Sequence, residues 1–495
     1  MRTCGILLPI FSLPSSGGIG NFGKEAYRFI DFLKSSKQSW WQILPLNPTN
    51  YGDSPYQSFS AYAGNPYFID PETLMEEGLL SREEFSSYDF GSDSSEIDYG
   101  KLYENRLNML RKAFARFVPN KEYENFCGQN SFWLEDYCLF MCIKNMHEDR
   151  AWEEWEDSLR FRDSEVIGKI KADETENLAF YRFVQFKFSE QWFALKKYAN
   201  EQGIGIIGDI PIYVAYDSAD VWSNPNQFIL DKNLKPIDVA GCPPDAFSED
   251  GQLWGNPLYN WPLMKKDGYS WWKKRIGHAI KLYDMVRIDH FRGFESFYAI
   301  PYGEKTARKG KWMKGPNMTL FNEFKKEFGD NLPIIAEDLG FLTPEVHTML
   351  KKSGYPGMKV IQFAFDESCN SGYLPHNYVK NCVVYTGTHD NDTIIGWTNS
   401  ATSEEVAIAE KYLHVDKAEG FNWAMMRSAL GSVGDMCILT MQDIIGLGSE
   451  ARINIPSTVG GNWQWRIDGG CINDWLANII AENTKLYGRA PKEEE

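Results

Sequence analysis

The chain has 495 residues, of which 43% are hydrophobic, and it carries a formal net charge of −17 at pH 7. This length allows a large core, in two or three domains or in one barrel enlarged by insertions. An acidic surface repels polyanions, and no apolar run is long enough to span a bilayer, so we expect neither nucleic acid nor membrane as a partner. The cysteines form no CxxC pair and residues 1–5 do not resemble a secretory signal, which favours a reduced, cytoplasmic protein.

Eight short apolar runs recur along the chain, and each has the length of a buried strand. They cover residues 4–9, 40–46, 204–214, 285–291, 333–340, 358–365, 382–388 and 437–446. Near-continuous hydrophobic runs of this kind are typical of parallel strands that are covered on both faces.

Helical patterns alternate with these runs. One helical face carries apolar residues at i, i+3, i+4 and i+7, namely Ala26, Phe29, Ile30 and Leu33. Thr402 and Glu405 have the spacing of a capping box, and residues 188–201, 269–282 and 474–485 also have helical patterns. Strands that alternate with helices indicate a parallel α/β sheet, and eight of them predict a (β/α)8 TIM barrel.

The second and third apolar runs are too far apart for a simple helical crossover, which predicts an insertion at this point. We expect residues 1–65 to carry the first two barrel strands and a substrate loop, and residues 66–186 to form an inserted, mostly helical subdomain. Residues 187–489 would complete the catalytic barrel, and residues 490–495 would form a disordered tail.

Acidic residues stand at the ends of four apolar runs, and they are Asp209, Asp289, Glu337 and Asp390. The carboxyl ends of barrel strands face one bowl, so these acids are expected to meet although they lie far apart in sequence. One Asp after a strand is usually a helix cap or turn former, but four acids on one face are harder to explain in this way. Clustered acids need basic partners, and Arg287 and His389 are placed to supply them.

Two close carboxyl groups suit the retaining cleavage of a glycosidic bond. One attacks the anomeric carbon, and the other protonates the leaving oxygen and later activates the acceptor. A metal site built from His290, His389, Asp289 and Asp390 is a competing interpretation. Neither HxH nor HExxH occurs, however, and we expect no metal and no other cofactor. The chain also lacks a P-loop, a GxGxxG motif and a GxSxG serine elbow.

Several longer motifs identify a resemblance that extends over nearly the whole chain. They cover residues 51–66 (YGDSPYQSFSAYAGNP), 208–214 (GDIPIYV), 243–261 (PPDAFSEDGQLWGNPLYNW), 286–293 (VRIDHFRG), 335–340 (IAEDLG) and 387–393 (GTHDNDT). In these motifs the chain resembles the 4-α-glucanotransferases of glycoside hydrolase family 77, which are called amylomaltase or disproportionating enzyme. The most specific of the motifs is the first, residues 51–66.

The resemblance implies a role for each matching residue. Asp289 would be the nucleophile, Glu337 the general acid/base and Asp390 the stabiliser of the transition state. Arg287 would orient Asp289 and balance its charge. The sugar that is cleaved would stack on the ring of Tyr56 and form hydrogen bonds with Asp209 and His389.

Other positions in the matching motifs imply contacts farther from the cleaved bond. Tyr51 matches an aromatic residue linked to glucan binding away from the cut. Residues 245–254 resemble a flap over the cleft, in which Asp245, Phe247 and Trp254 would contact the glucan. A loop after the last strand would contribute Asn462.

The implied activity is the transfer of an α-1,4-glucan segment from a donor maltodextrin to the 4-hydroxyl of glucose or of another glucan. The enzyme would act in starch and glycogen metabolism, as a monomer or homodimer. An α-amylase-type retaining hydrolase is the alternative within the same chemistry. A non-catalytic glucan-binding protein is a third possibility, which the intact set Asp289, Glu337 and Asp390 disfavours.

Overall fold

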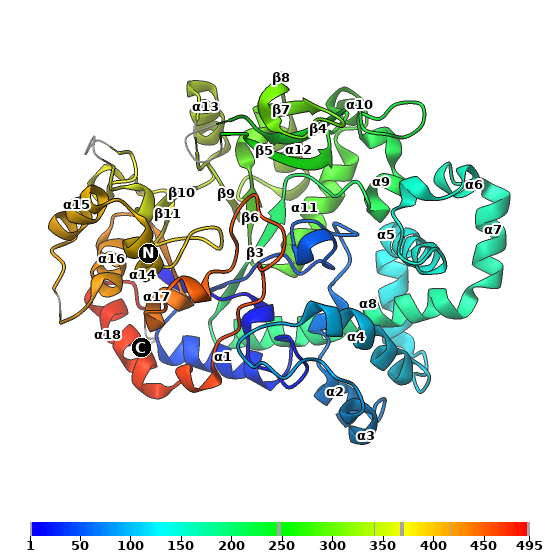
Figure 1. The fold of residues 1–495 in the computed structure, drawn as a ribbon, viewed down its shortest axis with the longest axis horizontal. Coiled ribbons are helices and arrows are strands. Elements are labelled where there is room, and N and C mark those ends of the chain that lie inside the picture. The colour runs from blue at the N-terminus through cyan, green and yellow to red at the C-terminus, as the bar shows by residue number, and fades with distance from the viewer. Residues whose placement is uncertain (1, 245–248, 341, 367–370, 417, 493–495) are drawn as a thin grey trace.

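The computed structural model describes residues 2–244, 249–340, 342–366, 371–416 and 418–492. At its centre an eight-stranded parallel sheet curls around the middle of the molecule (Figure 1). In spatial order the strands are β10 (Gly357–Val360), β11 (Cys382–Tyr385), β12 (Met436–Thr440), β1 (Thr3–Leu7), β2 (Trp40–Gln42), β3 (Gly205–Pro211), β6 (Met285–Asp289) and β9 (Ile334–Ala336). All eight predicted strands are confirmed.

The sheet closes between β9 and β10, where the two strands form only part of a regular hydrogen-bond ladder. The amide of Ala336 donates to the carbonyl oxygen of Pro356 at 2.9 Å. Beside it, the amide of Met358 donates to Oδ1 of Asp338 at 2.6 Å. A side chain thus replaces a strand hydrogen bond at the seam, and the sheet forms the nearly closed (β/α)8 barrel that the sequence predicts.

The apolar runs are longer than the strands because the loops that follow the strands are buried as well. The run at 204–214 contains β3 only from Gly205 to Pro211. Ile212, Tyr213 and Val214 lie beyond the strand and are nevertheless at most 5% exposed. Hydrophobicity alone therefore overestimates the strand lengths at the carboxyl end of the barrel.

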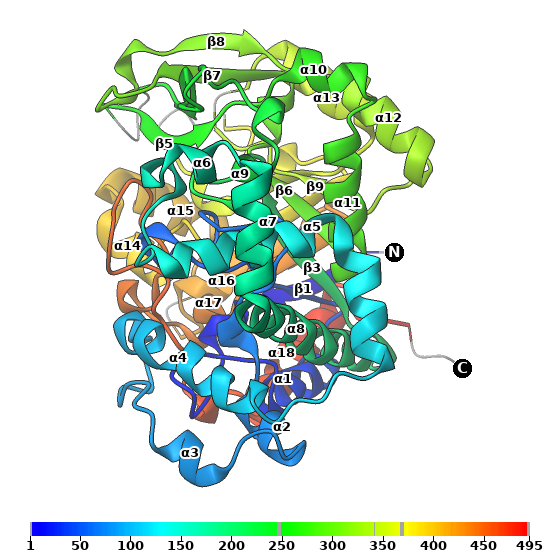
Figure 2. The same ribbon diagram turned by 90° about the vertical axis from the view of Figure 1, so that its right-hand side faces the viewer.

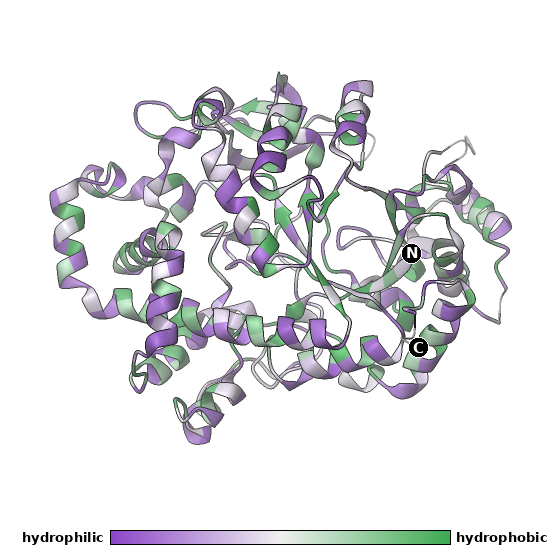
Figure 3. Cartoon of the chain, turned by 180° about the vertical axis from the view of Figure 1, so that it is seen from behind, coloured by the Kyte–Doolittle hydropathy of each residue, from purple (hydrophilic) through white to green (hydrophobic). Residues whose placement is uncertain are grey.

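Helices surround the barrel and mix hydrophilic with hydrophobic residues, whereas the central strands are mainly hydrophobic (Figure 3). They are α1 (Lys24–Ser35), α8 (Thr175–Glu201), α9 (Ala219–Ser223), α10 (Trp261–Lys266), α11 (Ser270–Leu282), α12 (Met318–Phe328), α13 (Pro344–Ser353), α14 (Ile394–Ser400), α15 (Ser403–Leu413), α16 (Phe421–Gly431), α17 (Met441–Ile445) and α18 (Asp474–Leu486). The predicted capping box of Thr402 and Glu405 begins α15. Within the described ranges, no helix has both the length and the hydrophobicity to cross a membrane.

The insertion between β2 and β3 is mostly helical, as predicted. Its helices are α2 (Pro71–Glu76), α3 (Arg82–Ser86), α4 (Tyr99–Phe114), α5 (Lys121–Met146), α6 (Asp157–Arg160) and α7 (Ser164–Asp173). The long helix α8 continues without a break through residue 186 and leads back to β3. Helices α5, α6 and α7 stand together at the right of Figure 1.

A second, antiparallel sheet lies beside the barrel, and the sequence did not predict it. Its strands, in spatial order, are β5 (Gln252–Pro257), β4 (Asp238–Cys242), β7 (Ser296–Pro301) and β8 (Lys311–Lys314). Figures 1 and 2 agree in placing this sheet at the top of the molecule. The strands are short extensions of the loops after β3 and β6, so they lack the long apolar runs that identify the barrel strands.

Candidate active site

The four predicted acids lie at or near the carboxyl ends of their strands. Asp209 lies in β3, Asp289 is the last residue of β6 and Glu337 follows β9 directly, while Asp390 lies in the loop after β11. Strands β3, β6 and β9 are neighbours in the sheet, and Asp209 is the register partner of Arg287 on β6. The fold therefore gathers acids from distant parts of the chain, as the sequence predicts.

Arg287 joins two of these acids. Its Nη1 lies 2.6 Å from Oδ2 of Asp209, and its Nη2 lies 3.0 Å from Oδ1 of Asp289. The predicted alternation on β6 is confirmed, because Arg287 and Asp289 point to the same face. Burial raises the pKa of Asp289, and the positive charge of Arg287 opposes this shift and favours the ionised carboxylate.

Glu337 is held by two backbone amides. Oε2 accepts a hydrogen bond from the amide of His290 at 2.7 Å, and Oε1 accepts one from the amide of Leu339 at 2.6 Å. His290 has a φ of 54°, a left-handed conformation that is uncommon outside glycine and often marks a functional site. Burial, followed by the negative charge of Asp289, raises the pKa of Glu337 to about 7, although Arg287 and both amides lower it.

Burial raises the pKa of both carboxyl groups, but Asp289 has a guanidinium as its direct partner, which opposes the shift. Near neutral pH, a carboxyl group with a pKa of about 7 holds its proton part of the time, whereas Arg287 stabilises the ionised form of Asp289. A pair of carboxyl groups with separated proton affinities is the arrangement that acid-assisted nucleophilic substitution requires.

Tyr56 and His389 form the wall next to Asp209. The hydroxyl of Tyr56 donates to Oδ2 of Asp209 at 2.9 Å. The two rings stack with centroids 5.0 Å apart and an interplanar angle of 18°. Trp463 closes the group, since its ring centroid lies 5.8 Å from that of Tyr56 and 5.9 Å from that of His389.

Asp390 lies at the other end of this wall. Its Oδ2 is 3.4 Å from Nε2 of His389, and its Oδ1 accepts a hydrogen bond from Nδ2 of Asn454 at 2.7 Å. Nη2 of Arg452 donates to the backbone oxygen of Asp390 at 2.6 Å. A continuous set of contacts therefore runs from Asp390 through His389 and Tyr56 to the carboxylates around Arg287.

Trp254 lies on β5, which reaches over from the antiparallel sheet. Its ring meets the ring of His290 edge to face, with centroids 4.8 Å apart and an interplanar angle of 85°. Because the amide of His290 binds Glu337, Trp254 lies on the side of the site where Glu337 acts.

Four predicted glucan contacts remain, and the structure describes two of these residues, Asn462 and Tyr51. Asn462 is buried, and its amide bonds within its own loop, where Oδ1 accepts from the amide of Ile455 and Nδ2 donates to Thr458. No contact of Asn462 with the carboxylates is found. Tyr51 begins a short 3₁₀ turn, whereas Asp245 and Phe247 lie outside the described residues.

Sequence reasoning missed three residues of this site. Trp463 follows Asn462 in the segment GGNW, so an aromatic residue in a predicted substrate loop was the available signal. His290 appears in the sequence only as a candidate metal ligand, although its place directly after Asp289 indicates a position near the proposed nucleophile. Nothing in the sequence marked Asn454. In the described part of the chain, no group of three or more His, Cys, Asp or Glu residues has the geometry of a metal site.

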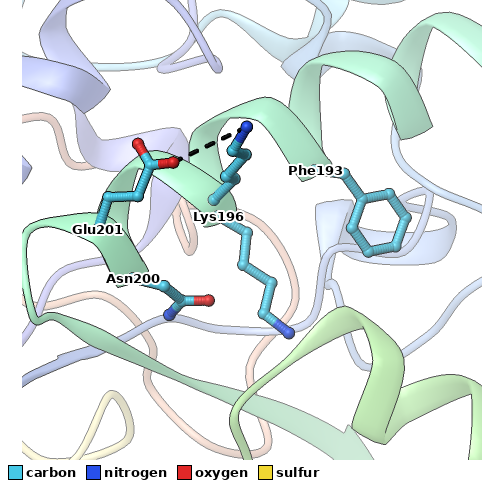
Figure 4. A pocket seen from close by; sticks show the side chains of 5 residues that line it. Phe193, Lys196, Asn200 and Glu201 are labelled. Atoms are coloured by element: carbon cyan, nitrogen blue, oxygen red, sulfur yellow. Dashed lines mark ion pairs between the residues drawn. The ribbon is translucent and has the colours of Figure 1, made fainter.

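A surface depression on α8 is separate from the carboxylate cluster (Figure 4). It is lined by Phe193, Lys196, Lys197, Asn200 and Glu201. Lys196 and Asn200 also contact Asp284, which precedes β6, whereas Asp289 ends that strand. The depression therefore lies at the opposite end of the barrel.

Comparisons with known proteins agree with this geometry. A family model described as 4-alpha-glucanotransferase, glycoside hydrolase family 77, matches residues 8–472. The 4-alpha-glucanotransferase of Clostridium butyricum is 50% identical over 97% of this chain and 99% of its own length. That of Thermus thermophilus is 46% identical over 94% of this chain and 95% of its own.

A solved structure shows the same fold. The amylomaltase from Streptococcus agalactiae in complex with acarbose is 41% identical, and the match covers 99% of this chain and 100% of that one with a TM-score of 0.96. The similarity thus includes both the barrel and its insertions. The protein belongs to the 4-alpha-glucanotransferase family, glycoside hydrolase family 77.

Proposed function

We propose that the protein is a 4-α-glucanotransferase that moves an α-1,4-glucan segment by a retaining double displacement. The observation that carries the proposal is the pairing of Asp289, whose ionised form Arg287 stabilises, with Glu337, whose pKa is raised to about 7. Membership in the 4-alpha-glucanotransferase family supports the substrate class.

In the first step the carboxylate of Asp289 attacks the anomeric carbon of the donor. The bond between that carbon and the glycosidic oxygen breaks, and Glu337 gives its proton to the departing oxygen. The products are a glycosyl ester of Asp289 and a shortened glucan with a free 4-hydroxyl. Asp390 stabilises the positive charge that develops on the sugar ring between these states.

In the second step the ionised Glu337 takes a proton from the 4-hydroxyl of an acceptor glucan. The acceptor oxygen attacks the anomeric carbon, the ester bond to Asp289 breaks, and the configuration of the donor is retained. Proton transfer by a positioned carboxyl group contributes about 10²–10⁴-fold to the rate.

The sugar to be cleaved lies, in this proposal, against the ring of Tyr56. Oδ1 of Asp209 is buried without a hydrogen-bond partner among the described residues, which fits a carboxylate that binds a sugar hydroxyl. His389 supplies a second polar contact. We assign the substrates as maltodextrins or other α-glucans, in line with the acarbose bound by the amylomaltase from Streptococcus agalactiae. We also propose a role in starch or glycogen metabolism and, from the absence of a CxxC pair, a location in the cytoplasm.

Product analysis on maltotriose tests the proposal. A transferase conserves the number of glycosidic bonds, so maltotriose is converted to glucose, maltotetraose and longer chains while the concentration of reducing ends stays constant. Added glucose shifts the products toward maltose. Steady growth of reducing ends without chains longer than maltotriose would instead identify the hydrolase alternative.

A further inference from the structure

Two amide side chains connect the two walls of the cleft. Nε2 of Gln57 donates to the backbone oxygen of Trp254 at 3.3 Å and to Oδ1 of Asn256 at 3.1 Å. Nδ2 of Asn256 lies 3.4 Å from Oε1 of Gln57 and donates to the backbone oxygen of Val214 at 2.9 Å. Asn256 is buried, so this connection is shielded from water.

The two walls serve different parts of the reaction. Gln57 follows Tyr56, whose hydroxyl bonds Asp209 on the side of the nucleophile. Trp254 packs against His290, whose amide binds Glu337 on the side where the leaving group departs and the acceptor arrives. The Gln57–Asn256 pair therefore spans from the donor side of the site to the acceptor side.

The backbone around Trp254 needs this support because β5 is irregular here. β5 is an edge strand, and its pairing with β4 shifts so that residues 254–256 stand opposite Ala240 alone. Gly255 within this bulge has a φ of 78°. A bulge re-aims a side chain, but it also removes regular ladder bonds from the residues that carry it. The amide of Gln57 supplies a bond to Trp254 from outside the sheet.

We infer that Gln57 and Asn256 are positioning residues that hold Trp254 over the acceptor side of the cleft and thereby favour transfer over hydrolysis. The inference rests on the proposed glucanotransferase function. When the glycosyl ester has formed, an acceptor sugar and water compete for it. A fixed aromatic ring orients the acceptor and excludes water, whereas a loose ring does neither.

The variant Gln57→Met tests the inference because it keeps an unbranched side chain of similar length and removes the bonds. The ratio of hydrolysis to transfer on maltotriose is expected to rise about fivefold, since the hydrogen bond of Gln57 to the backbone oxygen of Trp254 and its two contacts with Asn256 are lost. The KM for glucose as acceptor should rise by a similar factor, while the rate of the first, donor-cleaving step changes less than about threefold. Asn256→Asp, which removes the donor to Val214, is expected to shift the ratio in the same direction.

Gln185→Met is a matched control. Gln185 on α8 exchanges two hydrogen bonds with the backbone of Gly64, at 2.7 and 2.9 Å, in the same loop as Gln57 but without contacting β5. This variant should lose stability and keep the wild-type ratio of hydrolysis to transfer. An equal change in the ratio for Gln185→Met and Gln57→Met would overturn the inference, because general loosening of the loop would explain both.

The inference would also be overturned if the Gln57→Met enzyme folded and kept both the wild-type ratio of hydrolysis to transfer and the wild-type KM for the acceptor. If Gln57→Met does not fold, Gln57→Glu takes its place, since it keeps the shape and the acceptor oxygen and replaces the donor by a second, negatively charged oxygen. Its ratio must then rise, and an unchanged ratio refutes the inference. Failure of the proposed function would give a different result from failure of this inference. In that case the wild-type enzyme itself would form no chains longer than maltotriose.

Discussion

Asp289 and Glu337 are carboxyl groups of the same cluster, but they differ in the groups that contact them. Asp289 contacts the guanidinium of Arg287 at 3.0 Å. Among the described residues, Glu337 accepts hydrogen bonds from two uncharged backbone amides, and it lies near the negative charge of Asp289. Arg287 therefore favours the anion of Asp289, and Glu337 keeps its proton above its usual pKa, as the proposed roles of nucleophile and acid/base require.

The raised pKa of Glu337 also affects stability. Glu337 binds its proton more tightly in the folded protein than in the unfolded chain, so stability declines as pH rises from about 4.5 to about 7. Glu337→Gln removes this effect. Between pH 4.5 and pH 8 we expect the stability of the variant relative to the wild type to rise by up to about 3 kcal/mol, on top of a pH-independent loss, because the new NH2 group faces a backbone N–H that a carboxyl oxygen accepts in the wild type.

The same variant should lose about 10²–10⁴-fold in turnover on maltotriose. Differential scanning calorimetry at the two pH values and product assays measure both effects. Glu337→Ala is not suitable as a comparison, because it leaves a cavity and two unsatisfied amides. An equal difference in stability between variant and wild type at pH 4.5 and pH 8 would contradict the assigned pKa.

Among the structural elements, the loop at residues 452–463 holds Asp390, the residue proposed to stabilise the transition state. Asn454 bonds Asp390 at 2.7 Å, and its backbone amide bonds the carbonyl oxygen of His389 at 3.1 Å. Trp463 has a φ of 64°, which is strained for a bulky residue, and the hydroxyl of Tyr99 donates to its backbone oxygen at 3.0 Å. This anchor from the insertion fixes the loop against the barrel.

Replacing Asn454 tests whether this loop positions Asp390. Asn454→Ala should lower kcat about 10–100-fold with little change in KM, because the orientation of Asp390 matters most in the transition state. Asn462→Ala, in the same loop, removes bonds to Ile455 and Thr458 and none to Asp390. We expect it to affect KM more than kcat. Steady-state kinetics of both variants on maltotriose separate these outcomes, and an unchanged kcat for Asn454→Ala would contradict the positioning role.

The sequence predicted those elements whose signal is local. Eight buried strands follow from continuous apolar runs, and α1 follows from the spacing of Ala26, Phe29, Ile30 and Leu33, all of which are buried. The antiparallel sheet could not be predicted in this way, because its pairing joins the loops after β3 and β6 and includes a bulge in β5. Asn454 was missed for the same reason, since its role depends on a contact with a residue 64 positions away.

In the molecule as a whole, an ion pair between a buried lysine and a partly buried aspartate anchors the insertion to the segment after β3. Nζ of Lys144 on α5 lies 2.6 Å from Oδ2 of Asp217 in the segment after β3. Oδ1 of Asp217 accepts from the amide of Trp152, and Lys144 lies 5.0 Å from the ring centroid of Phe59 in the loop that carries Tyr56. The insertion therefore supports the donor side of the cleft.

Lys144→Met should destabilise the protein by about 3 kcal/mol, because it leaves the carboxylate of Asp217 without its partner in a mostly buried position. The double variant Lys144→Met/Asp217→Leu should recover part of this loss. Lys197→Met is the matched control, since Lys197 and Glu201 form an exposed pair at 3.8 Å in the depression of Figure 4 and contribute at most about 1 kcal/mol. Equal losses for Lys144→Met and Lys197→Met in thermal unfolding would contradict this account.

In the proposed mechanism, Asp289 forms the covalent intermediate and Glu337 acts on the acceptor. This mechanism is tested most directly by incubating Glu337→Gln with an α-maltosyl fluoride, whose fluoride leaves without acid assistance, and analysing the peptides by mass spectrometry. Because the base that activates the acceptor is missing, the account predicts accumulation of a maltosyl ester on the peptide that contains Asp289. A maltosyl ester on Asp390 or Asp209, or fluoride release without any labelled peptide, would contradict it.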